Sequence, residues 1–381
     1  MDKLNNLIQK YCPEGVEYRN LGEIAQIATG KGITKKDCIE NGKYPIISGG
    51  ITPMGKYNLF NRNENTVTIS RVGINAGFVN YINEKFYLND KCFSIMPKYK
   101  QINNKYMYYF LKKNEKEIND LQSKSGVPTI NTKKLSCIKI PIPPIRVQEE
   151  IVRILDSFTK LNEKLNEELI KRKKQYEYYR DKLLSFDKND TNVKWMKLGE
   201  VSYIPKERTS SENISLYISV ENMLKDKGGI IKSNNKPKCG NTIKFNKEDI
   251  LIGNIRPYLK KIWYADCNGG TNSDVVLIRN NDPNVLLSRY MYYQLASDIF
   301  FNYNNSFAKG GKMPRGDKKK IMEYFFPIPP LETQQRIVSI LDCFEQLCNN
   351  LTVGLPSEIE ARQKQYEYYR DKLLTFKELK Q

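Results

Sequence analysis

Residues 174–184 read KQYEYYRDKLL, and the same eleven letters recur at residues 364–374. Identity over eleven consecutive positions indicates an internal duplication. Two more matches precede these segments: PIPP at 141–144 and 327–330, and QEEIVRILD from Gln148 with QQRIVSILD from Gln334. The chain is therefore predicted to consist of two tandem copies of one plan, each about half its length.

Each PIPP segment is predicted to be extended and to be followed by a long helix. Closely spaced prolines remove backbone donors and keep the preceding residues out of the helical region. Beyond them, apolar residues recur three and four positions apart, from Leu155 to Phe186 in the first copy and from Leu341 to Phe376 in the second. This spacing is typical of a coiled-coil seam, and the first helix is predicted to span residues 147–185.

The second helix is predicted to be interrupted. Its seam contains one extra interval of four residues, which locally unwinds a coiled coil. Gly354 and Pro356 lie at that point. We therefore expect a kink or a restart there, with Ser357 and Glu360 able to form a capping box.

The two helices are predicted to pair with each other as an antiparallel coiled coil with pseudo-twofold symmetry. A helix with an apolar seam but no core beside it needs a partner helix, and the duplication supplies one in the same chain. Only nine residues, 187–195, lie between the first helix and the next domain, which is too short for the return connection of a parallel pair. The alternative is that each helix packs on its own domain.

The segment before each helix is predicted to be a mixed α/β (α+β) domain. Short β-branched runs such as 66–70 and 249–252 are separated by Gly, Asn and Pro, as in strands joined by turns. YMYYFL from Tyr106 and YMYYQL from Tyr290 are interpreted as buried helices, although tyrosines can also stack on bases. The predicted boundaries are domain 1–146, helix 147–186, domain 187–330 and helical segment 331–381.

The net charge of +19 is confined to the two predicted domains. Residues 1–146 carry +11 and residues 187–330 carry +8, whereas residues 147–186 carry +1 and residues 331–381 carry −1. A protein that is merely lysine-rich would spread this excess evenly. The distribution therefore favours a polyanionic partner for the two domains.

Composition argues against several classes of function. The chain has no histidine, and its eight cysteines include no C-x-x-C pair, so a mixed zinc site and a histidine general base are excluded. The cysteines are interpreted as reduced thiols. No apolar run approaches the roughly 18 residues of a membrane span, and residues 1–11 do not read as a secretory signal. We expect a cytoplasmic protein with no membrane partner.

The exact repeat also points to an external partner. A purely structural helix would need only its seam preserved between copies, yet the residues between the seam positions are identical too. One kind of partner, bound twice, would explain this identity. The candidate docking residues are Tyr176, Tyr178 and Arg180, with their copies Tyr366, Tyr368 and Arg370.

The order of domain, P-x-P-P with Q-x-x-I, long helix, and then the same again resembles the specificity (S) subunit of type I restriction-modification systems. The resemblance covers nearly the whole chain. It implies that each domain is a target-recognition domain that reads one half of a bipartite, asymmetric site in double-stranded DNA. It also implies that the helix pair sets the distance between the half-sites and docks two modification (methyltransferase) subunits.

The resemblance places the chemistry on partner subunits. The modification subunits of this family carry S-adenosylmethionine and methylate adenine N6, and restriction (motor-nuclease) subunits use ATP and Mg²⁺. This chain is then expected to bind no cofactor and no metal and to have no catalytic residue of its own.

The candidate DNA contacts lie in loops, where lysine suits phosphate and arginine suits guanine. Pro128 and Pro314 are 186 residues apart, so the loops around them are expected to be equivalent, with different side chains for different half-sites. The alternatives are solvated surface for each lysine and a structural ion pair for each arginine. The candidates are Lys31, Lys35, Lys36, Arg71 and Lys124 in the first domain, and Arg256, Tyr258, Lys309, Lys312 and Arg315 in the second.

Rival functions remain open. A free-standing DNA methyltransferase or nuclease is disfavoured, because the sequence has no Asp/Asn-Pro-Pro-aromatic loop, no glycine-rich cofactor loop and no GxxxxGK[ST] pattern. A basic coiled-coil scaffold would not bind DNA selectively. A specificity subunit of a related methyltransferase-nuclease system is a close variant.

Overall fold

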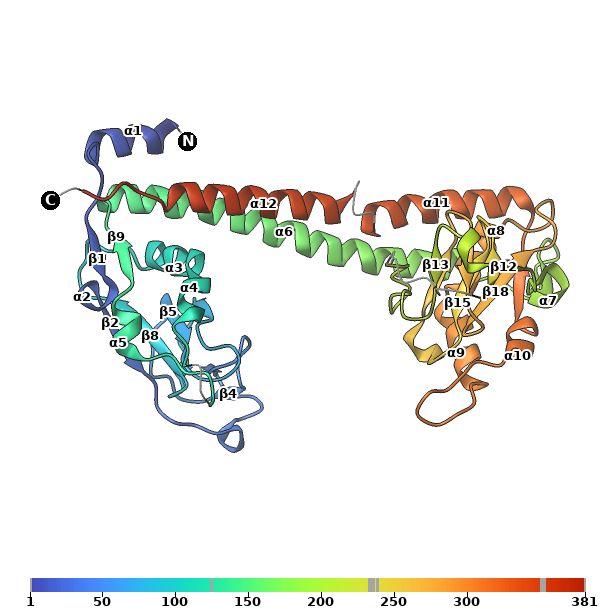
Figure 1. Ribbon diagram of the computed structural model, residues 1–381, viewed down its shortest axis with the longest axis horizontal. Helices are drawn as coiled ribbons and strands as arrows, with labels where there is room; N and C mark the ends of the chain where they lie inside the picture. The colour runs from blue at the N-terminus through green and yellow to red at the C-terminus, as the bar shows by residue number, and fades with distance from the viewer. Residues whose placement is uncertain (1, 124–125, 232–236, 238–239, 350–353, 380–381) are drawn as a thin grey trace. The chain divides into compact units, whose positions relative to one another are not determined.

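The computed structural model describes residues 2–123, 126–231, 237, 240–349 and 354–379. The chain divides into two units: unit 1 comprises Met1–Asn166 with Glu358–Gln381, and unit 2 comprises Glu167–Ser357. Each unit thus contains one globular domain and parts of both long helical segments (Figure 1). Each long helical segment is thus divided between the two units, whereas the predicted boundaries treated domains and helices as separate segments.

Unit 1 is built on an antiparallel sheet in the order β2-β8-β5-β6, beside a smaller sheet in the order β4-β3-β7. Helix α3 packs against β5 and β6 (Figure 1). The strands are β1 (Tyr18–Asn20), β2 (Ala25–Thr29), β3 (Tyr44–Ile47), β4 (Lys56–Tyr57), β5 (Thr66–Ser70), β6 (Val79–Ile82), β7 (Tyr87–Leu88), β8 (Cys92–Pro97) and β9 (Lys139–Pro141). The short helices are α1 (Asp2–Tyr11), α2 (Leu21–Ile24), η1 (Lys35–Asp37), α3 (Asn104–Lys113), α4 (Glu115–Asp120) and α5 (Thr132–Ser136).

Unit 2 repeats this plan with sheets in the orders β11-β18-β15-β16 and β12-β14-β17-β13. The strands are β10 (Lys194–Lys197), β11 (Ser202–Tyr203), β12 (Arg208–Ser210), β13 (Tyr217–Ile218), β14 (Asn241–Phe245), β15 (Ile250–Gly253), β16 (Ile262–Tyr264), β17 (Gly269–Thr271), β18 (Val275–Asn280) and β19 (Phe325–Ile328). The short helices are α7 (Leu198–Val201), η2 (Ser211–Asn213), η3 (Pro257–Leu259), α8 (Ser288–Leu295), α9 (Asp298–Ser306) and α10 (Lys318–Met322).

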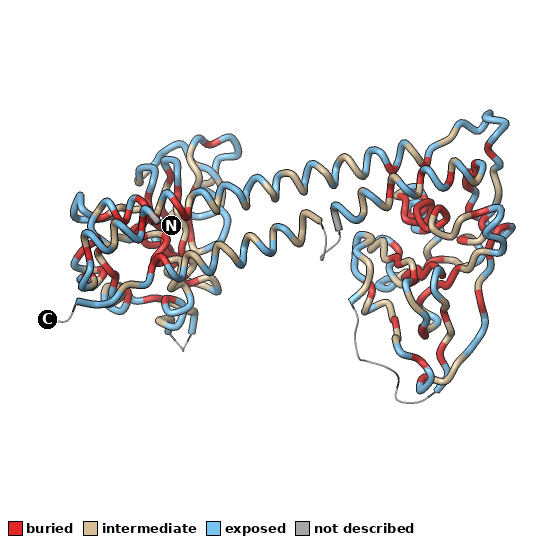
Figure 2. Tube along the Cα trace, turned by 90° about the horizontal axis from the view of Figure 1, so that it is seen from above, coloured by how far each residue is buried: buried red, intermediate tan, exposed pale blue. Residues whose placement is uncertain are grey.

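The tyrosine-rich segments are buried, as predicted. Tyr106 and Met107 on α3 and Tyr290 and Met291 on α8 are fully buried in the cores of their units. Figure 2 shows that buried residues concentrate in the globular parts, whereas the long helices carry mostly half-buried and exposed residues. These tyrosines therefore stabilise the domains and cannot stack on bases.

The PIPP segments are extended, which confirms the prediction. Strand β9 pairs antiparallel with β1, and β19 pairs antiparallel with β10. A buried glutamine then holds each segment against the helix that follows. Gln148 donates to the carbonyl oxygens of Pro143 (2.7 Å) and Gln101 (3.0 Å), and its own side-chain oxygen accepts from the Asn103 backbone N–H (2.8 Å).

The second copy contains the same arrangement. Gln334 donates to the carbonyl oxygens of Pro329 (2.8 Å) and Val285 (3.0 Å) and accepts from the Leu287 backbone N–H (2.8 Å). Both glutamines are completely buried. The glutamine of the repeated P-I-P-P-x-x-x-Q pattern thus joins the PIPP segment to the backbone just before α3 or α8.

Three helices form the long helical segments: α6 (Ile145–Leu184), α11 (Leu331–Asn349) and α12 (Leu355–Leu373). In unit 1, the ring of Phe158 on α6 stacks on Tyr369 of α12 at 5.4 Å, and the Asn162 side chain donates to Gln363 at 3.3 Å. As α6 advances, its partners on α12 move backwards, so the helices pair antiparallel, side by side (Figure 1). In unit 2, Tyr179 of α6 stacks on Phe344 of α11 at 5.9 Å.

The predicted helix break is present between α11 and α12, and residues 350–353 lie outside the described part of the chain. Gly354 has a φ of +144°, and a Cβ there would lie 2.7 Å from the carbonyl oxygen of Gln346. The predicted capping box is wrong. Because α12 begins at Leu355, Ser357 lies inside its first turn, and Glu360 pairs with Lys364 at 2.6 Å.

The segments at the start and end of the chain pair within unit 1. Val16 forms a parallel bridge with Glu378, and the Val16 N–H donates to the Lys377 carbonyl oxygen at 2.9 Å. Gly15, with a φ of +118°, permits this approach, because a Cβ there would lie 2.5 Å from the same oxygen. The end of the chain is thereby anchored to the segment that enters the first domain.

Candidate nucleic-acid interface and docking helix

Each domain brings two separate loops together at one end of its main sheet. In unit 1, Val72 bridges Thr129, and the Gly73 N–H donates to the Pro128 carbonyl oxygen at 2.9 Å. In unit 2, Ile255 bridges Arg315, and the Arg256 N–H donates to the Pro314 carbonyl oxygen at 2.7 Å. The equivalence expected from Pro128 and Pro314 therefore holds in the backbone. We call each joined pair of segments, 70–74 with 126–130 and 253–258 with 309–316, a loop pair.

The loop pairs align the two domains residue by residue. The Arg71 N–H donates to the Lys91 carbonyl oxygen at 2.9 Å, and the Asn254 N–H donates to the Asp274 carbonyl oxygen at 2.8 Å. Arg71 therefore corresponds to Asn254. Arg256 corresponds to Gly73. The candidate arginines Arg71 and Arg256 lie in equivalent loops but two positions apart.

Arg71 is half-buried and packs on its own domain. Its guanidinium lies 5.7 Å from the centre of the Phe93 ring and donates to the Asp90 carbonyl oxygen at 3.4 Å. The exposed Lys31 lies near the same segment, since its N–H donates to the Leu88 carbonyl oxygen at 3.0 Å. Lys124 lies outside the described residues.

Lys35 and Lys36 are exposed on the turn η1. Asp37 accepts hydrogen bonds from both the backbone N–H (2.8 Å) and the hydroxyl (2.7 Å) of Thr34. These hydrogen bonds lower the pKa of Asp37, because they stabilise its charged form. The two lysines are thus presented by an ordered turn.

The candidates of the second domain gather at its loop pair. Arg256 is exposed, Tyr258 is 51% exposed on η3, and Lys312 is exposed. Arg315 pairs with Asp274 at 3.0 Å, and Lys309 pairs with Asp317 at 3.4 Å. The two cations are largely exposed, so these pairs contribute little to stability. They orient the two cations and leave them accessible to a partner.

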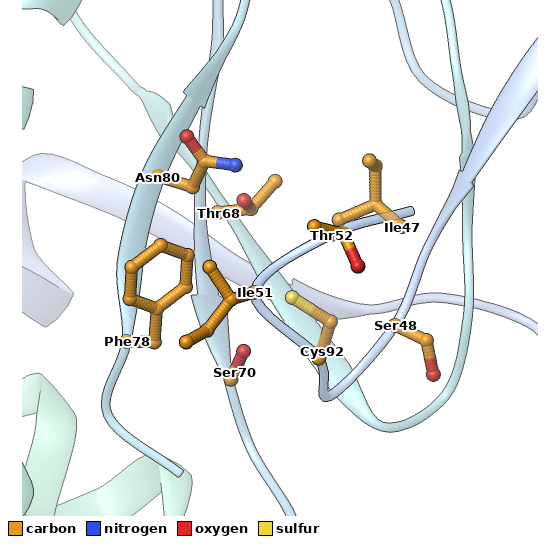
Figure 3. Close-up of a pocket in the computed structure, with 10 residues that line it drawn as sticks. Ile47, Ser48, Ile51, Thr52, Thr68, Ser70, Phe78, Asn80 and Cys92 are labelled. Carbon is orange, nitrogen blue, oxygen red and sulfur yellow. The ribbon is translucent and has the colours of Figure 1, made fainter. Parts of the chain in front are cut away.

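A pocket of about 380 Å³ lies beside the loop pair of unit 2. Its lining combines cations and acids: Ser219, Val220, Glu221, Ile255, Arg256, Leu259, Lys261, Asn272, Asp274 and Met313. A cavity of unit 1 holds only about 10 Å³, room for about one water, between Ile47, Ser70, Phe78 and Cys92 (Figure 3). Burial raises the pKa of Cys92 to about 12, so this thiol stays protonated. The two cavities thus differ in size and in charge.

The six candidate docking residues divide into three environments. Tyr178 and Tyr368 are each 61% exposed. Tyr176 and Tyr366 are half-buried against the cores of their units. Arg180 is buried, with its side chain only 4% exposed, and pairs with Asp181 (2.7 Å) and with Asp298 of α9 (3.7 Å). Arg180 is therefore not available for docking, because it is bound by its own unit.

Arg370, the copy of Arg180, is 21% exposed and pairs with Asp371 at 2.8 Å. Sequence reasoning missed the other exposed residues of the repeat. They are spaced three and four apart, away from the seam, and this spacing was a usable signal. The exposed residues that both copies share are Lys174, Glu177, Tyr178, Asp181 and Lys182 on α6, and Lys364, Glu367, Tyr368, Asp371 and Lys372 on α12. We call each set the repeated face.

Neither a metal centre nor a membrane span appears in the described part of the chain. Among the described residues, no three His, Cys, Asp or Glu side chains are grouped so that they could hold an ion. No helix in that part is long and apolar enough to cross a bilayer.

Comparison with known proteins shows similarity over most of the chain. A family described as "Type I restriction modification DNA specificity domain" matches residues 13–171 and again residues 191–361. A candidate type I restriction enzyme specificity subunit of Haemophilus influenzae is 32% identical over 95% of this chain and 96% of its own length. The EcoR124I/EcoR124II specificity subunit of Escherichia coli is 34% identical over 71% of this chain and 70% of its own length.

Solved structures show the same fold. The S subunit of a type I restriction-modification system from M. genitalium superposes with a TM-score of 0.63 at 18% identity, covering 94% of this chain and 96% of that one. A chain from a study of complex assembly and conformational transition in a type I system superposes with a TM-score of 0.61 at 14% identity, covering 95% and 98%.

Proposed function

The chain belongs to the family of type I restriction-modification DNA specificity subunits, and on that premise we propose that it reads a bipartite, asymmetric DNA site with one domain for each half-site. The observation that carries this proposal is the loop pair. Its backbone is the same in both domains, yet the positions of Gly73 and Thr129 in unit 1 hold Arg256 and Arg315 in unit 2. One scaffold with two sets of side chains suits two different half-sites.

The positive charge supports the same role. The excess of basic residues lies in the two domains. Exposed lysines are Lys31, Lys35 and Lys36 in the first domain, and Lys309 and Lys312 in the loop pair of the second. Such lysines supply phosphate contacts that hold the domain on the duplex and make its affinity depend on salt.

The helices are proposed to set the distance between the half-sites and to dock two modification subunits. The repeated face supports docking, because the same five exposed residues recur at the same spacing on α6 and α12. Each domain therefore carries beside it one copy of the surface that a modification subunit would bind. Restriction subunits would join the same complex in the cytoplasm.

This chain is proposed to act without a catalytic site or cofactor of its own. S-adenosylmethionine, ATP and Mg²⁺ would be bound by the partner subunits. This chain contributes the DNA sequence specificity: its loop pairs select the sequence, and its helices bring the methyltransferase to it.

Mapping of N6-methyladenine tests the proposal. The chain is co-expressed with its cognate modification subunit in a host that lacks adenine methylation. We expect methylation at a single motif made of two specific, unequal parts separated by a nonspecific spacer. Methylation without sequence preference, or at a motif with only one specific part, would contradict the proposal. The modification subunit expressed alone is the control.

A further inference from the structure

Arg256 has a backbone conformation that arginine rarely adopts. Its φ is +54°, in the left-handed region, where a side chain costs roughly 1 kcal/mol or more. The equivalent residue of unit 1 is Gly73, with a φ of +102° and nothing within 4 Å of the place where a Cβ would stand. Glycine satisfies this loop without strain, so the backbone does not require an arginine there. We therefore expect the arginine side chain at this position to have a role of its own.

The Arg256 side chain is available for such a role. It is exposed, and no described residue supplies it with a salt bridge or a side-chain hydrogen bond. By contrast, the neighbouring Arg315 is paired with Asp274 at 3.0 Å. Arg256 also lies at the wall of the 380 Å³ pocket. A structural ion pair, the alternative considered for these arginines, therefore does not account for Arg256.

The carboxylates in the pocket limit the kinds of ligand that Arg256 can bind there. Glu221 and Asp274 both line the pocket, and two carboxylates repel a phosphate group. Asp274 is engaged by Arg315, whereas Glu221 is exposed, accepts no hydrogen bond from a described residue, and interacts electrostatically with Lys261, another residue of the pocket wall. The wall of one pocket therefore carries the Glu221 carboxylate, which can accept hydrogen bonds, and the Arg256 guanidinium, which can donate them.

That combination matches one base-pair edge. In the major groove a G·C pair presents the N7 and O6 acceptors of guanine beside the N4 amino donor of cytosine. An arginine donates to the first pair of atoms, and a glutamate accepts from the amino group. In unit 1 neither side chain exists, because Gly73 replaces Arg256 and, by the alignment of β3 with β13, Gly50 replaces Glu221.

We propose that Arg256 and Glu221 together read one G·C pair in the half-site of the second domain. The inference rests on the proposed function and goes further, in that it assigns a base pair and two residues to one domain. The first domain, with glycine at both positions, does not read a base pair at the equivalent place.

Binding measurements on the complex of the full chain with its modification subunit test this pair. The DNA probes carry the methylated site of the wild-type complex, with every base pair of both half-sites changed in turn. For Arg256→Gly, we expect the preference for G·C to fall roughly 5- to 150-fold at one position of one half-site, with the other positions unchanged. Glu221→Gln should weaken discrimination at the same position.

Lys312→Ala is the matched control, since Lys312 is an exposed cation of the same loop pair. It should weaken binding equally on all probes and reduce the salt dependence by about one ion. Arg256→Gly should also leave the melting temperature unchanged or raised, because glycine removes the backbone strain. A loss of folding would show that Arg256 is structural and would overturn the proposal.

Two other results would overturn it as well. If Arg256→Gly weakens binding to all probes equally, the arginine contacts phosphate. If it leaves binding to every probe unchanged, the arginine does not touch DNA. Loss of discrimination at different positions by the two variants would separate Arg256 from Glu221. A wild-type complex that binds every probe alike would instead refute the proposed function itself.

Discussion

Two glutamines show how single residues maintain this fold. Gln148 and Gln334 are each fully buried, and each satisfies three backbone groups near the point where an extended PIPP segment leads into a long helix. Buried backbone groups need a hydrogen-bond partner, and the buried glutamine side chains supply it here. The glutamines therefore fix the start of α6 and of α11 against their own domains.

Replacing Gln148 by leucine should destabilise unit 1. The variant leaves the carbonyl oxygens of Pro143 and Gln101 and the Asn103 N–H without this partner. Since one buried unsatisfied group costs about 1–3 kcal/mol, we expect a loss of at least about 2 kcal/mol. Hydrogen exchange should show faster opening around residues 139–151. Gln9→Leu, at an exposed position of α1, is the control, and equal stability of the two variants would contradict the assignment.

Asp298 connects the loop pair of unit 2 with helix α6. It accepts from Lys227 and Lys260, both at 2.8 Å, and lies 3.7 Å from Arg180. Partial burial raises the pKa of Asp298, but the hydrogen bonds from Lys227 and Lys260 outweigh this effect and lower the pKa to about 2. Lys260 follows η3, which begins next to Arg256. One carboxylate therefore holds the helix and the segment after Arg256 together.

Asp298→Asn should remove a pH-dependent contribution to stability. The pKa in the folded state lies below the ordinary value of 3.8, so the carboxylate stabilises the fold above about pH 4 and loses this effect as pH falls towards 2. The side chain is 46% exposed, so solvent screening keeps the contribution to about 1 kcal/mol. The free energy of unfolding of unit 2, measured from pH 5 to pH 2, should fall less steeply in the variant than in the wild type. An unchanged pH profile would show that the three cations do not act through Asp298.

At the scale of the element, the repeated helix segments have one sequence and two roles. Their seam residues pack in both units, as in the stacks of Phe158 on Tyr369 and Tyr179 on Phe344. Their repeated faces remain exposed in both units. Arg180 and Arg370 differ, because unit 2 provides Asp298 for Arg180, whereas in unit 1 Lys113 of α3 contacts the corresponding region through the Asp371 carbonyl oxygen and the Thr375 hydroxyl.

Tyr178→Ala and Tyr368→Ala should each weaken the binding of one modification subunit. Exposed tyrosines at the centre of a small interface are typical binding hot spots, worth roughly tenfold or more in affinity. The mass of the assembled complex should fall from two modification subunits to one in either single variant and to none in the double variant at limiting concentration. Glu163→Ala, exposed on α6 outside the repeat, is the control. Retention of both subunits by the double variant would exclude the repeated face as the docking surface.

At the scale of the whole molecule, the proposed role of the helices predicts that the spacer length can change while both half-site sequences stay the same. Four residues added to α6, and four to the segment formed by α11 and α12, lengthen each helix by about 6 Å. That length is close to two base-pair steps of 3.4 Å. Methylome sequencing should therefore show both half-sites unchanged and the spacer altered. An altered half-site with the original spacer would be incompatible with this role of the helices.

Much of the architecture could be predicted because it depends on the spacing and type of residues along the chain. Duplication follows from identity, the helices and their antiparallel pairing from three-four spacing and a short connection, and the extended PIPP segments from the geometry of proline. The helix break at Gly354 was predicted from a single extra interval. The start of α12 at Leu355 was not, because the capping pattern at Ser357 suited a start three residues later.

The sequence by itself therefore determined the duplication, the domain order, the helix pairing and the surface charge of this protein, because each depends on spacing or composition along the chain. Only the tertiary structure decided that Arg180 is buried while Tyr178 is exposed, that Arg256 corresponds to Gly73 and not to Arg71, and that Glu221 and Arg256 line the same pocket. These facts depend on contacts between residues far apart in the chain, and such contacts form only when a core brings the segments together.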